Sequence, residues 1–221
     1  MSARKLRILQ VMRAPVGGLF RHVADLTRAL AAEGHAVGLV VDSLANDAQT
    51  ESKLTALLPH ASLGIHRFAM PRVLGRGDLV TPLGVRKLAK SLDIDILHGH
   101  GAKGGFYARL ARLGGGKAVA LYTPHGGVLH FSRSSRSGRI FHWLERQLMA
   151  QTAAIIFESQ YARTTYATLI GEPTCPVCGG GDGSAVVARI WGEHAMCHFS
   201  LQSVKRARKS LKKTLGREWG L

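Results

Sequence analysis

The sequence predicts an α/β fold, in which a Rossmann-like, doubly wound parallel sheet is followed by an irregular C-terminal tail. Short apolar runs rich in β-branched residues alternate with segments of helical periodicity along residues 1–172. Because neighbouring parallel strands need a crossover connection, this alternation is typical of a parallel sheet with helices on both faces. After Gly171 the periodic pattern is lost, so residues 1–172 are predicted to form the domain and residues 173–221 the tail.

Six strands are predicted, each a short apolar run bounded by polar or turn-forming residues. The third of them stops before Pro71, which lacks the backbone N–H that a sheet needs. The predicted strands are Leu6–Met12, Ala36–Asp42, Gly64–Met70, Ile94–His98, Ala118–Thr123 and Ala153–Phe157.

Five helices are predicted from apolar residues that recur three or four positions apart. In the first helix Val23, Leu26 and Leu30 share one face, and Gly34 follows at the position where glycine commonly ends a helix. The predicted helices are Leu19–Glu33, Val80–Leu92, Lys103–Arg112, Ile140–Gln151 and Gln160–Ile170.

The composition fits a globular protein with anionic partners. Its 221 residues are 46% hydrophobic and 20% charged, with a formal net charge of +16, which favours phosphates, nucleic acid or acidic lipid headgroups. No apolar run approaches the ~20 residues that span a bilayer. Gln10 and Arg13 interrupt the first apolar run too early for a signal peptide. We expect a cytoplasmic protein, with peripheral contact at the inner face of the membrane left open.

The segment from Asp93 to Arg112 is the most informative part of the chain. It places His98-Gly-His100-Gly between a predicted strand and a predicted helix, with Lys103 at the start of that helix. Two imidazoles and an amine therefore lie between the carboxyl end of a strand and a helix N-terminus. Ligands of open α/β sheets bind at that position, because unpaired backbone N–H groups point outward there.

Four segments of the chain, in this order, resemble the N-terminal domain of family 4 glycosyltransferases, and most closely the bacterial enzymes that build capsule, exopolysaccharide or O-antigen. Each segment alone is a weak signal, whereas their common order and spacing are more specific. Together they cover roughly residues 5–172. The segments are Ile8-Leu9-Gln10-Val11 with Gly17-Gly18 and Arg21-His22-Val23; the pattern Asp-Ile-Leu-His-x-His-x-x-Lys-x-Gly with Ala108-Arg109; Thr123-Pro124-His125-Gly126-Gly127; and Glu145-Arg146 with Ala153, Ile155, Ile156 and Ser159.

The resemblance implies one half of a GT-B fold and a part in polysaccharide biosynthesis. Such enzymes transfer a sugar with retention from a nucleotide-sugar donor to a lipid-linked or saccharide acceptor, and the donor is a substrate rather than a cofactor. This chain would be the N-terminal, acceptor-binding domain. Carried over by position, the resemblance implies a catalytic role for His125, donor diphosphate binding by Gly17 and Gly18, and substrate binding by His22, His100 and Lys103.

The glycine pair Gly17-Gly18 has two interpretations. Glycine lets a diphosphate approach the backbone beside a helix N-terminus, but the same pair also suits a plain turn between a strand and a helix. The resemblance favours diphosphate binding. Because the G-x-G-x-x-G spacing is absent, a dinucleotide enzyme is disfavoured, and Asp42 is interpreted as a strand-end polar residue.

The histidines and Lys103 also leave alternatives open. His98 and His100 share one face of a strand and could form a metal pair, or His98 could pack at the strand end while His100 lines a ligand site. No metal is expected, because the family that the chain resembles is usually metal-independent. His125 either contacts the transferred sugar or is a turn histidine bonded to backbone. For Lys103, contact with an anion or acceptor is narrowly favoured over a structural role.

The tail holds all three cysteines, Cys175, Cys178 and Cys197. With His194 and His198 they have the residue types of a zinc site, but glycine-rich sequence replaces the apolar residues that a zinc finger buries. The tail is therefore predicted to be poorly ordered. Its basic end could bind anionic lipid, whereas nucleic acid is disfavoured because only Trp219 offers an aromatic ring there.

The resemblance stops where the tail begins. The family continues there into a second Rossmann-like domain, which carries the residues that grip the nucleotide sugar. The chain is therefore interpreted as truncated, or as one part of an enzyme whose second domain is a separate chain. Two rival interpretations are an inactive remnant, whose last ~47 residues derive from a shifted reading frame, and a non-enzymatic basic module that binds anionic lipid or nucleic acid.

Overall fold

The computed structural model describes residues 5–44, 47–71, 75, 77–113, 115–126, 135–173 and 177–178. Within these ranges one sheet forms from seven strands, of which six were predicted. The strands are β1 Arg7–Val11, β2 Ala36–Asp42, β3 Ile65–Phe68, β4 Ile96–His100, β5 Val119–Thr123, β6 Thr152–Ile156 and the two-residue β7 Val177–Cys178.

The strands lie in the order β3-β2-β1-β4-β5-β6-β7, and every pairing is parallel. This confirms the predicted doubly wound parallel sheet. The chain builds outward from β1 to β3 on one side and then returns to place β4 on the other side of β1. The boundary between β1 and β4 is therefore the topological switch point, where open α/β sheets bind ligands.

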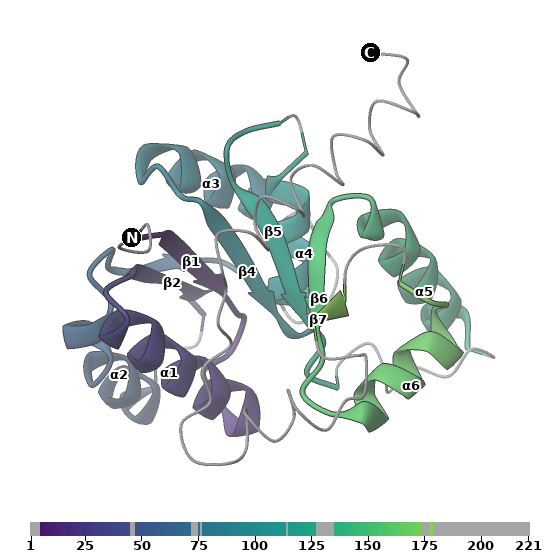
Figure 1. Cartoon of the computed structure of the whole chain (residues 1–221), viewed down its shortest axis with the longest axis horizontal. Helices are drawn as coiled ribbons and strands as arrows, with labels where there is room; N and C mark the ends of the chain where they lie inside the picture. The colour runs from purple at the N-terminus through teal and green to yellow at the C-terminus, as the bar shows by residue number, and fades with distance from the viewer. Residues whose placement is uncertain are drawn as a thin grey trace.

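Helices connect the strands on both faces of the sheet. Figure 1 shows α1 and α2 beside the β1–β2 end and α5 and α6 beside the β6 end. The helices are α1 Gly17–Ala32, α2 Ala48–Thr55, α3 Gly77–Ser91, α4 Gly101–Ala111, α5 Arg136–Met149 and α6 Gln160–Leu169, with a short 3-10 helix at Leu58–His60.

Three local features differ from the sequence prediction. The strand predicted to start at Ile94 starts at Ile96, because Ile94 still donates its N–H to the end of α3 and Asp93 adopts a φ of 47°. At its other end the strand extends to His100, which pairs with Thr123 of β5. Helix α2 was not predicted, since it buries only Thr50 and Leu54 and has little apolar periodicity.

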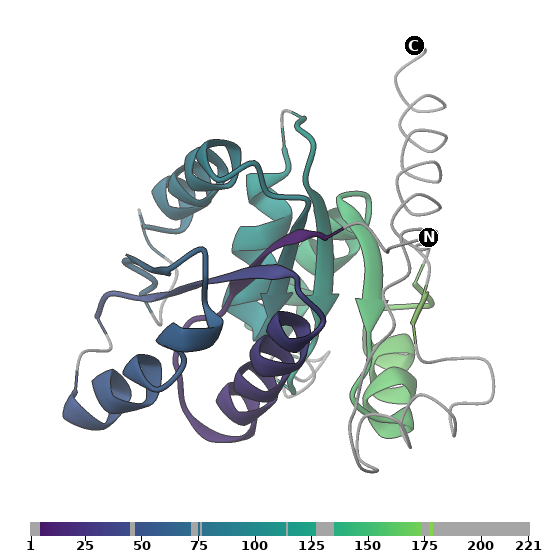
Figure 2. The ribbon, with the colours of Figure 1, turned by 60° about the vertical axis from the view of Figure 1, so that its left-hand side comes forward.

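The core has two layers because successive strand residues point to opposite faces. On one face Ile8, Leu39 and Ile96 pack toward α1, and on the other Leu9 and Leu97 pack toward α3 and α4. Figure 2 shows the helices on the two sides of the twisted sheet. The α1 face also carries the polar groups of the candidate site.

A buried ion pair fixes α4 to α5 on the opposite face. Arg109 is fully buried and donates to both carboxylate oxygens of Glu145, at 2.8 and 2.7 Å. Its guanidinium carbon lies 3.9 Å from the centre of the Tyr122 ring, and its Nε donates to the Gly105 carbonyl oxygen. Every charged group in this contact is paired, which is the condition for burying charge in a core.

The predictions for the tail fall almost wholly outside the described residues. Cys197, His194 and His198 lie in the part of the chain that the structure does not describe, as does the basic end. Among the described helices, none is both long and apolar enough to cross a membrane.

Candidate active site

Polar side chains replace the apolar core at the carboxyl end of the sheet, on the face that α1 covers. Gln10 of β1, His98 and His100 of β4 and Thr123 of β5 are each at most 3% exposed. In the sheet register Gln10 lies beside His98, and His100 lies beside Thr123. These groups therefore form a compact polar patch next to the β1–β4 switch point.

A chain of hydrogen bonds with a defined direction joins α1 to β4. The Thr27 hydroxyl donates to the Val23 carbonyl oxygen at 2.7 Å, and Thr27 Oγ1 accepts the Gln10 amide N–H at 3.0 Å. The side-chain amide oxygen of Gln10 lies 2.8 Å from His100 Nε2. Because an amide oxygen only accepts, Nε2 carries the hydrogen, and neutral His100 presents the lone pair of Nδ1 on its other side.

His22, His100 and His125 form what we call the histidine cluster, and Glu158 borders it. His125 Nε2 lies 3.1 Å from His100 Nδ1, and His125 Nδ1 lies 2.7 Å from Glu158 Oε1. The His22 ring centre lies 5.0 Å from that of His125 and 5.8 Å from that of His100. Side chains from α1, from the end of β4, and from the segments just after β5 and β6 thus meet at one point.

Burial controls the charge of this cluster. It lowers the pKa of His22 and holds the pKa of His98 and of His100 well below the ordinary value, and neighbouring imidazoles lower all three further. Burial raises the pKa of Glu158, but the hydrogen bond with His125 and the charges of His125 and His22 outweigh it, so that pKa is lowered. Neutral His98 and His100 are therefore separate from the ionised Glu158 carboxylate, which contacts His125 and His22.

His98 and His100 share one face, as their spacing predicted, and their ring centres are 4.0 Å apart. His98 Nε2 is 2.9 Å from the Thr123 hydroxyl, and His98 is not part of the histidine cluster. The two residues therefore have different surroundings. His98 packs within the sheet face, whereas His100 joins His22 and His125.

Gly17 and Gly18 begin α1 on the same side of the sheet as the histidine cluster. Gly17 has a φ of +63°, in the left-handed region that favours glycine. Among the described residues, no atom lies within 4 Å of a Cβ added at either glycine. The described part of the fold therefore gives Gly18 no packing requirement.

The glycines around His100 have a different explanation. A Cβ at Gly104 would lie 2.2 Å from the Val11 carbonyl oxygen, and one at Gly105 would lie 2.2 Å from the Tyr122 ring. A Cβ at Gly99 would meet the backbone of Gly105 at 2.5 Å. These glycines allow α4 to pack directly on β1, β4 and β5, so they serve packing rather than ligand approach.

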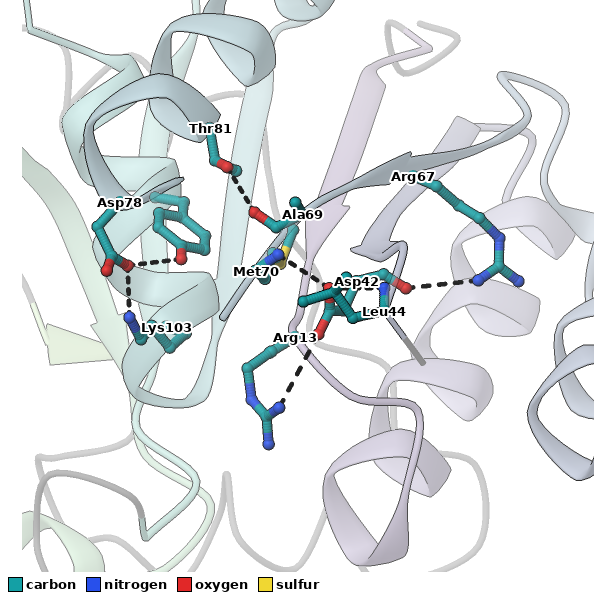
Figure 3. A network of polar contacts seen from close by, with 10 residues as sticks. Arg13, Asp42, Leu44, Arg67, Ala69, Met70, Asp78, Thr81 and Lys103 are labelled. Carbon is teal, nitrogen blue, oxygen red and sulfur yellow. Dashed lines mark hydrogen bonds and ion pairs between the residues drawn. The ribbon is translucent and has the colours of Figure 1, made fainter. Parts of the chain in front are cut away.

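The side chain of Lys103 reaches toward Asp78 at the start of α3 (Figure 3). Its ammonium pairs with Asp78, whose carboxylate also accepts the Tyr107 hydroxyl and the Gly75 N–H. Burial raises the pKa of Asp78, but these donors outweigh it and lower that pKa. In this structure the positive charge of Lys103 is neutralised within the domain, and its predicted contact with substrate remains a prediction.

Asp42 behaves as the strand-end polar residue that the sequence indicated. Its Oδ1 accepts the backbone N–H groups of Leu44 and Met70, at 3.0 and 2.8 Å, and Arg13 lies 3.9 Å from its Oδ2 (Figure 3). Asp42 thereby ties the end of β2 to the segment that follows β3. These contacts give it a structural role.

Sequence reasoning missed two members of the site, Gln10 and Glu158. Both could have been found from strand alternation, since Glu158 continues the series Ala154 and Ile156 on the α1 face, and Gln10 follows Ile8 on that face. For Gln10 the signal is a polar residue at a core position of a buried strand, whereas Glu158 lies two residues beyond the end of β6 and is 28% exposed.

A family profile described as Glycosyltransferase Family 4 matches residues 16–178 of the chain. No curated protein sequence matches the chain significantly. The matched range contains Gly17, Gly18, the histidine cluster and Glu158.

Several solved structures share the fold. A glycosyltransferase from Rickettsia africae is 17% identical with a TM-score of 0.59, and the match covers 79% of this chain and 42% of that one. The Anabaena protein HepE, solved with UDP and glucose, is 16% identical with a TM-score of 0.55, covering 78% and 43%. A sucrose-phosphate synthase structure from Thermosynechococcus elongatus is 14% identical with a TM-score of 0.53, covering 99% and 100%. This chain therefore spans less than half the length of the first two.

Proposed function

The chain belongs to glycosyltransferase family 4, and we propose that it is the N-terminal, acceptor-binding domain of a retaining glycosyltransferase. The donor is a nucleotide sugar and the acceptor is a lipid-linked or free saccharide. The observation that carries the proposal is the site at the β1–β4 switch point, where the open loop at Gly17 and Gly18 lies on the same side as the histidine cluster. A second domain, in the same longer protein or in a separate chain, provides the facing wall.

The open glycine loop suits the donor diphosphate. The first turn of α1 presents backbone N–H groups and partial positive charge, and no side chain of Gly17 or Gly18 blocks their approach to an anion. No acidic residue lies in that first turn to repel one. During transfer the bond between the sugar carbon and the diphosphate oxygen breaks, so stabilising the departing charge lowers the barrier.

The histidine cluster suits the transferred sugar and the acceptor. The acceptor oxygen bonds to the sugar carbon on the face that the diphosphate leaves, and its proton passes to the departing diphosphate. His125 stabilises charge near that carbon, and Glu158 holds the His125 ring through the 2.7 Å contact to Nδ1. His22 and His100 flank His125 and bind substrate hydroxyl groups, with Lys103 as a further contact once it exchanges Asp78 for an anion.

The proposed acceptor class supports a role in polysaccharide biosynthesis, in the cytoplasm at the inner face of the membrane. A net charge of +16 favours the anionic headgroups and diphosphates found there. A Gly18→Asp substitution would set a carboxylate beside the proposed diphosphate position. It should weaken binding of the chain to UDP-glucose in ligand-observed NMR, whereas His60→Asp, on the 3-10 helix, should not.

A transfer assay tests the proposal. The purified chain, given several nucleotide sugars and a lipid-linked acceptor, should transfer no sugar or only traces, because one lost preorganised group already costs ~10²–10³ in rate. Adding a second-domain polypeptide should restore transfer, and His125→Ala should abolish the restored activity.

Other outcomes of the binding and transfer experiments would distinguish the proposal from its two rival interpretations, the inactive remnant and the basic binding module. Rapid transfer by the chain alone would contradict the need for a second domain. Absence of binding to nucleotide sugar and acceptor, with no transfer after addition of the second domain, would indicate an inactive remnant. Binding to anionic vesicles without any sugar binding would indicate the basic module instead.

A further inference from the structure

The histidine cluster has the spacing of ligands around one metal ion. Its ligand nitrogen atoms all lie within 4.8 Å of one another. Its ring centres are separated by 5.0, 5.4 and 5.8 Å. Three imidazoles bound tetrahedrally to one zinc ion, with Zn–N distances of about 2.0–2.1 Å, would have ring centres about 5 Å apart. His22, His100 and His125 therefore need only small side-chain rotations to reach one ion.

The outer nitrogens of two of the three rings already have the partners that metal-bound histidines use. His100 Nε2 donates to the amide oxygen of Gln10 at 2.8 Å, and His125 Nδ1 faces Glu158 Oε1 at 2.7 Å. Such amide and carboxylate acceptors fix which nitrogen faces the ion and raise its basicity. The two inner nitrogens, His100 Nδ1 and His125 Nε2, lie 3.1 Å apart, which two ligands of one ion can adopt.

His22 completes the set from a different element. Its Nδ1 lies 3.8 Å from Glu158 Oε1, so the same carboxylate borders both His22 and His125. A negative charge beside the rings favours a cation between them. His98 does not compete, because its Nε2 is held by Thr123 and it lies outside the group.

The exposure of the cluster also suits a metal. The side chains of His22 and Glu158 are 19% and 28% exposed, which gives an ion a path from solvent. Lys103 is paired with Asp78 rather than with a member of the cluster.

We propose that His22, His100 and His125 form a binding site for one divalent transition-metal ion of the zinc class. The ion replaces the proton shared between His100 and His125, and solvent supplies the fourth ligand. Three imidazoles select zinc, nickel or cobalt rather than calcium or magnesium, which prefer oxygen ligands. The site departs from the metal-free expectation drawn from sequence, and it does not depend on the proposed glycosyltransferase activity.

Metal binding by the full chain tests the site directly. The three tail cysteines are changed to serine in every sample, because thiolates bind zinc on their own. Titration calorimetry with Zn²⁺ at neutral pH should show one saturable site. With Co²⁺ as the probe, X-ray absorption should show nitrogen and oxygen neighbours only.

Matched variants assign the ligands. Glu158→Gln, which removes the negative charge of this outer partner, should weaken Zn²⁺ binding about 10–100-fold, and His22→Ala should weaken it by at least as much. His60→Ala, which removes an imidazole outside the cluster, should leave the affinity unchanged. Circular dichroism and thermal unfolding establish that His22→Ala and Glu158→Gln are folded.

Two results would overturn the site. One is the absence of saturable Zn²⁺ binding by the chain without cysteines. The other is equal affinity of His22→Ala and His60→Ala, which would assign the metal to residues elsewhere in the chain. Neither measurement uses a sugar substrate, so failure of the metal site can be distinguished from failure of the proposed transfer reaction.

Discussion

Two glycine pairs at helix starts look alike in the sequence and differ in the structure. Gly17-Gly18 begins α1, and a Cβ at either position would meet nothing within 4 Å. Gly104-Gly105 lies in the first turns of α4, where a Cβ would collide at 2.2 Å with β1 backbone or with the Tyr122 ring. The second pair is required by packing, whereas the first is left open by the fold.

The difference shows how to separate structural from functional glycine. A glycine with a backbone or ring within 3 Å of its absent Cβ is explained by the fold alone. Gly17 is also explained by its φ of +63°, whereas Gly18 has neither a close neighbour among the described residues nor a left-handed φ, and binding of an anion supplies a reason for it. The following predictions test this contrast, from the largest expected effect to the smallest.

Loss of the ion pair on the packed side should have the largest effect. Arg109→Ala removes the cation that α4 contributes to this ion pair. It leaves the buried carboxylate of Glu145 without its charged partner, which typically costs about 3–5 kcal/mol of unfolding free energy. The matched control is Arg28→Ala, whose partner Asp25 is exposed, with an expected loss of at most about 1 kcal/mol. Urea denaturation measures both. Equal losses would contradict the structural role assigned to Arg109.

An added methyl group on the packed pair should have the next largest effect. Gly104→Ala places a Cβ against the Val11 carbonyl oxygen, and because backbone is less able to move than a side chain, α4 must shift. Overpacking of this kind costs about 1–3 kcal/mol. Urea denaturation should show that loss. An unchanged denaturation midpoint would mean that α4 does not pack as closely as described.

Acid should destabilise the domain through the buried histidines. Burial holds the pKa of His98 and of His100 well below 6.5, whereas in the unfolded chain these residues bind protons near that pH. The unfolding free energy should therefore fall as the pH drops below about 6.5. His98→Asn should make the pH dependence shallower, and His60→Asn should not. The unfolding free energy is measured by urea denaturation at about pH 5–8. If it depends on pH equally in the original chain and in His98→Asn, His98 is not a source of the effect.

The smallest effect on stability is expected at the open pair. Gly18→Ala adds a methyl group that meets no neighbour and replaces glycine within a helix, so the unfolding free energy should stay constant or rise by up to about 1 kcal/mol. Thermal unfolding compared with Gly104→Ala provides the measurement. A clear loss of stability in Gly18→Ala would show that the glycine loop after β1 is packed after all.

Local patterns in the sequence determined the layout of the sheet. Apolar runs and helical periodicity depend on residues two to four positions apart, so they predicted six parallel strands and placed His100, His125 and Gly17 at strand ends. The same alternation contained the signal for Gln10 and Glu158, as polar residues on a buried face. Helix α2 was missed because it buries too few residues to show a period.

Only the tertiary structure decided which polar groups meet. Gln10 and His100 are 90 residues apart and bond because β1 and β4 are neighbours at the switch point, and Lys103 turns to Asp78 because α3 packs on α4. The packing need of Gly104 likewise arises from the approach of α4 to β1. Such contacts depend on the order of the strands and on the distance between the layers. Short-range sequence periodicity determines neither of them.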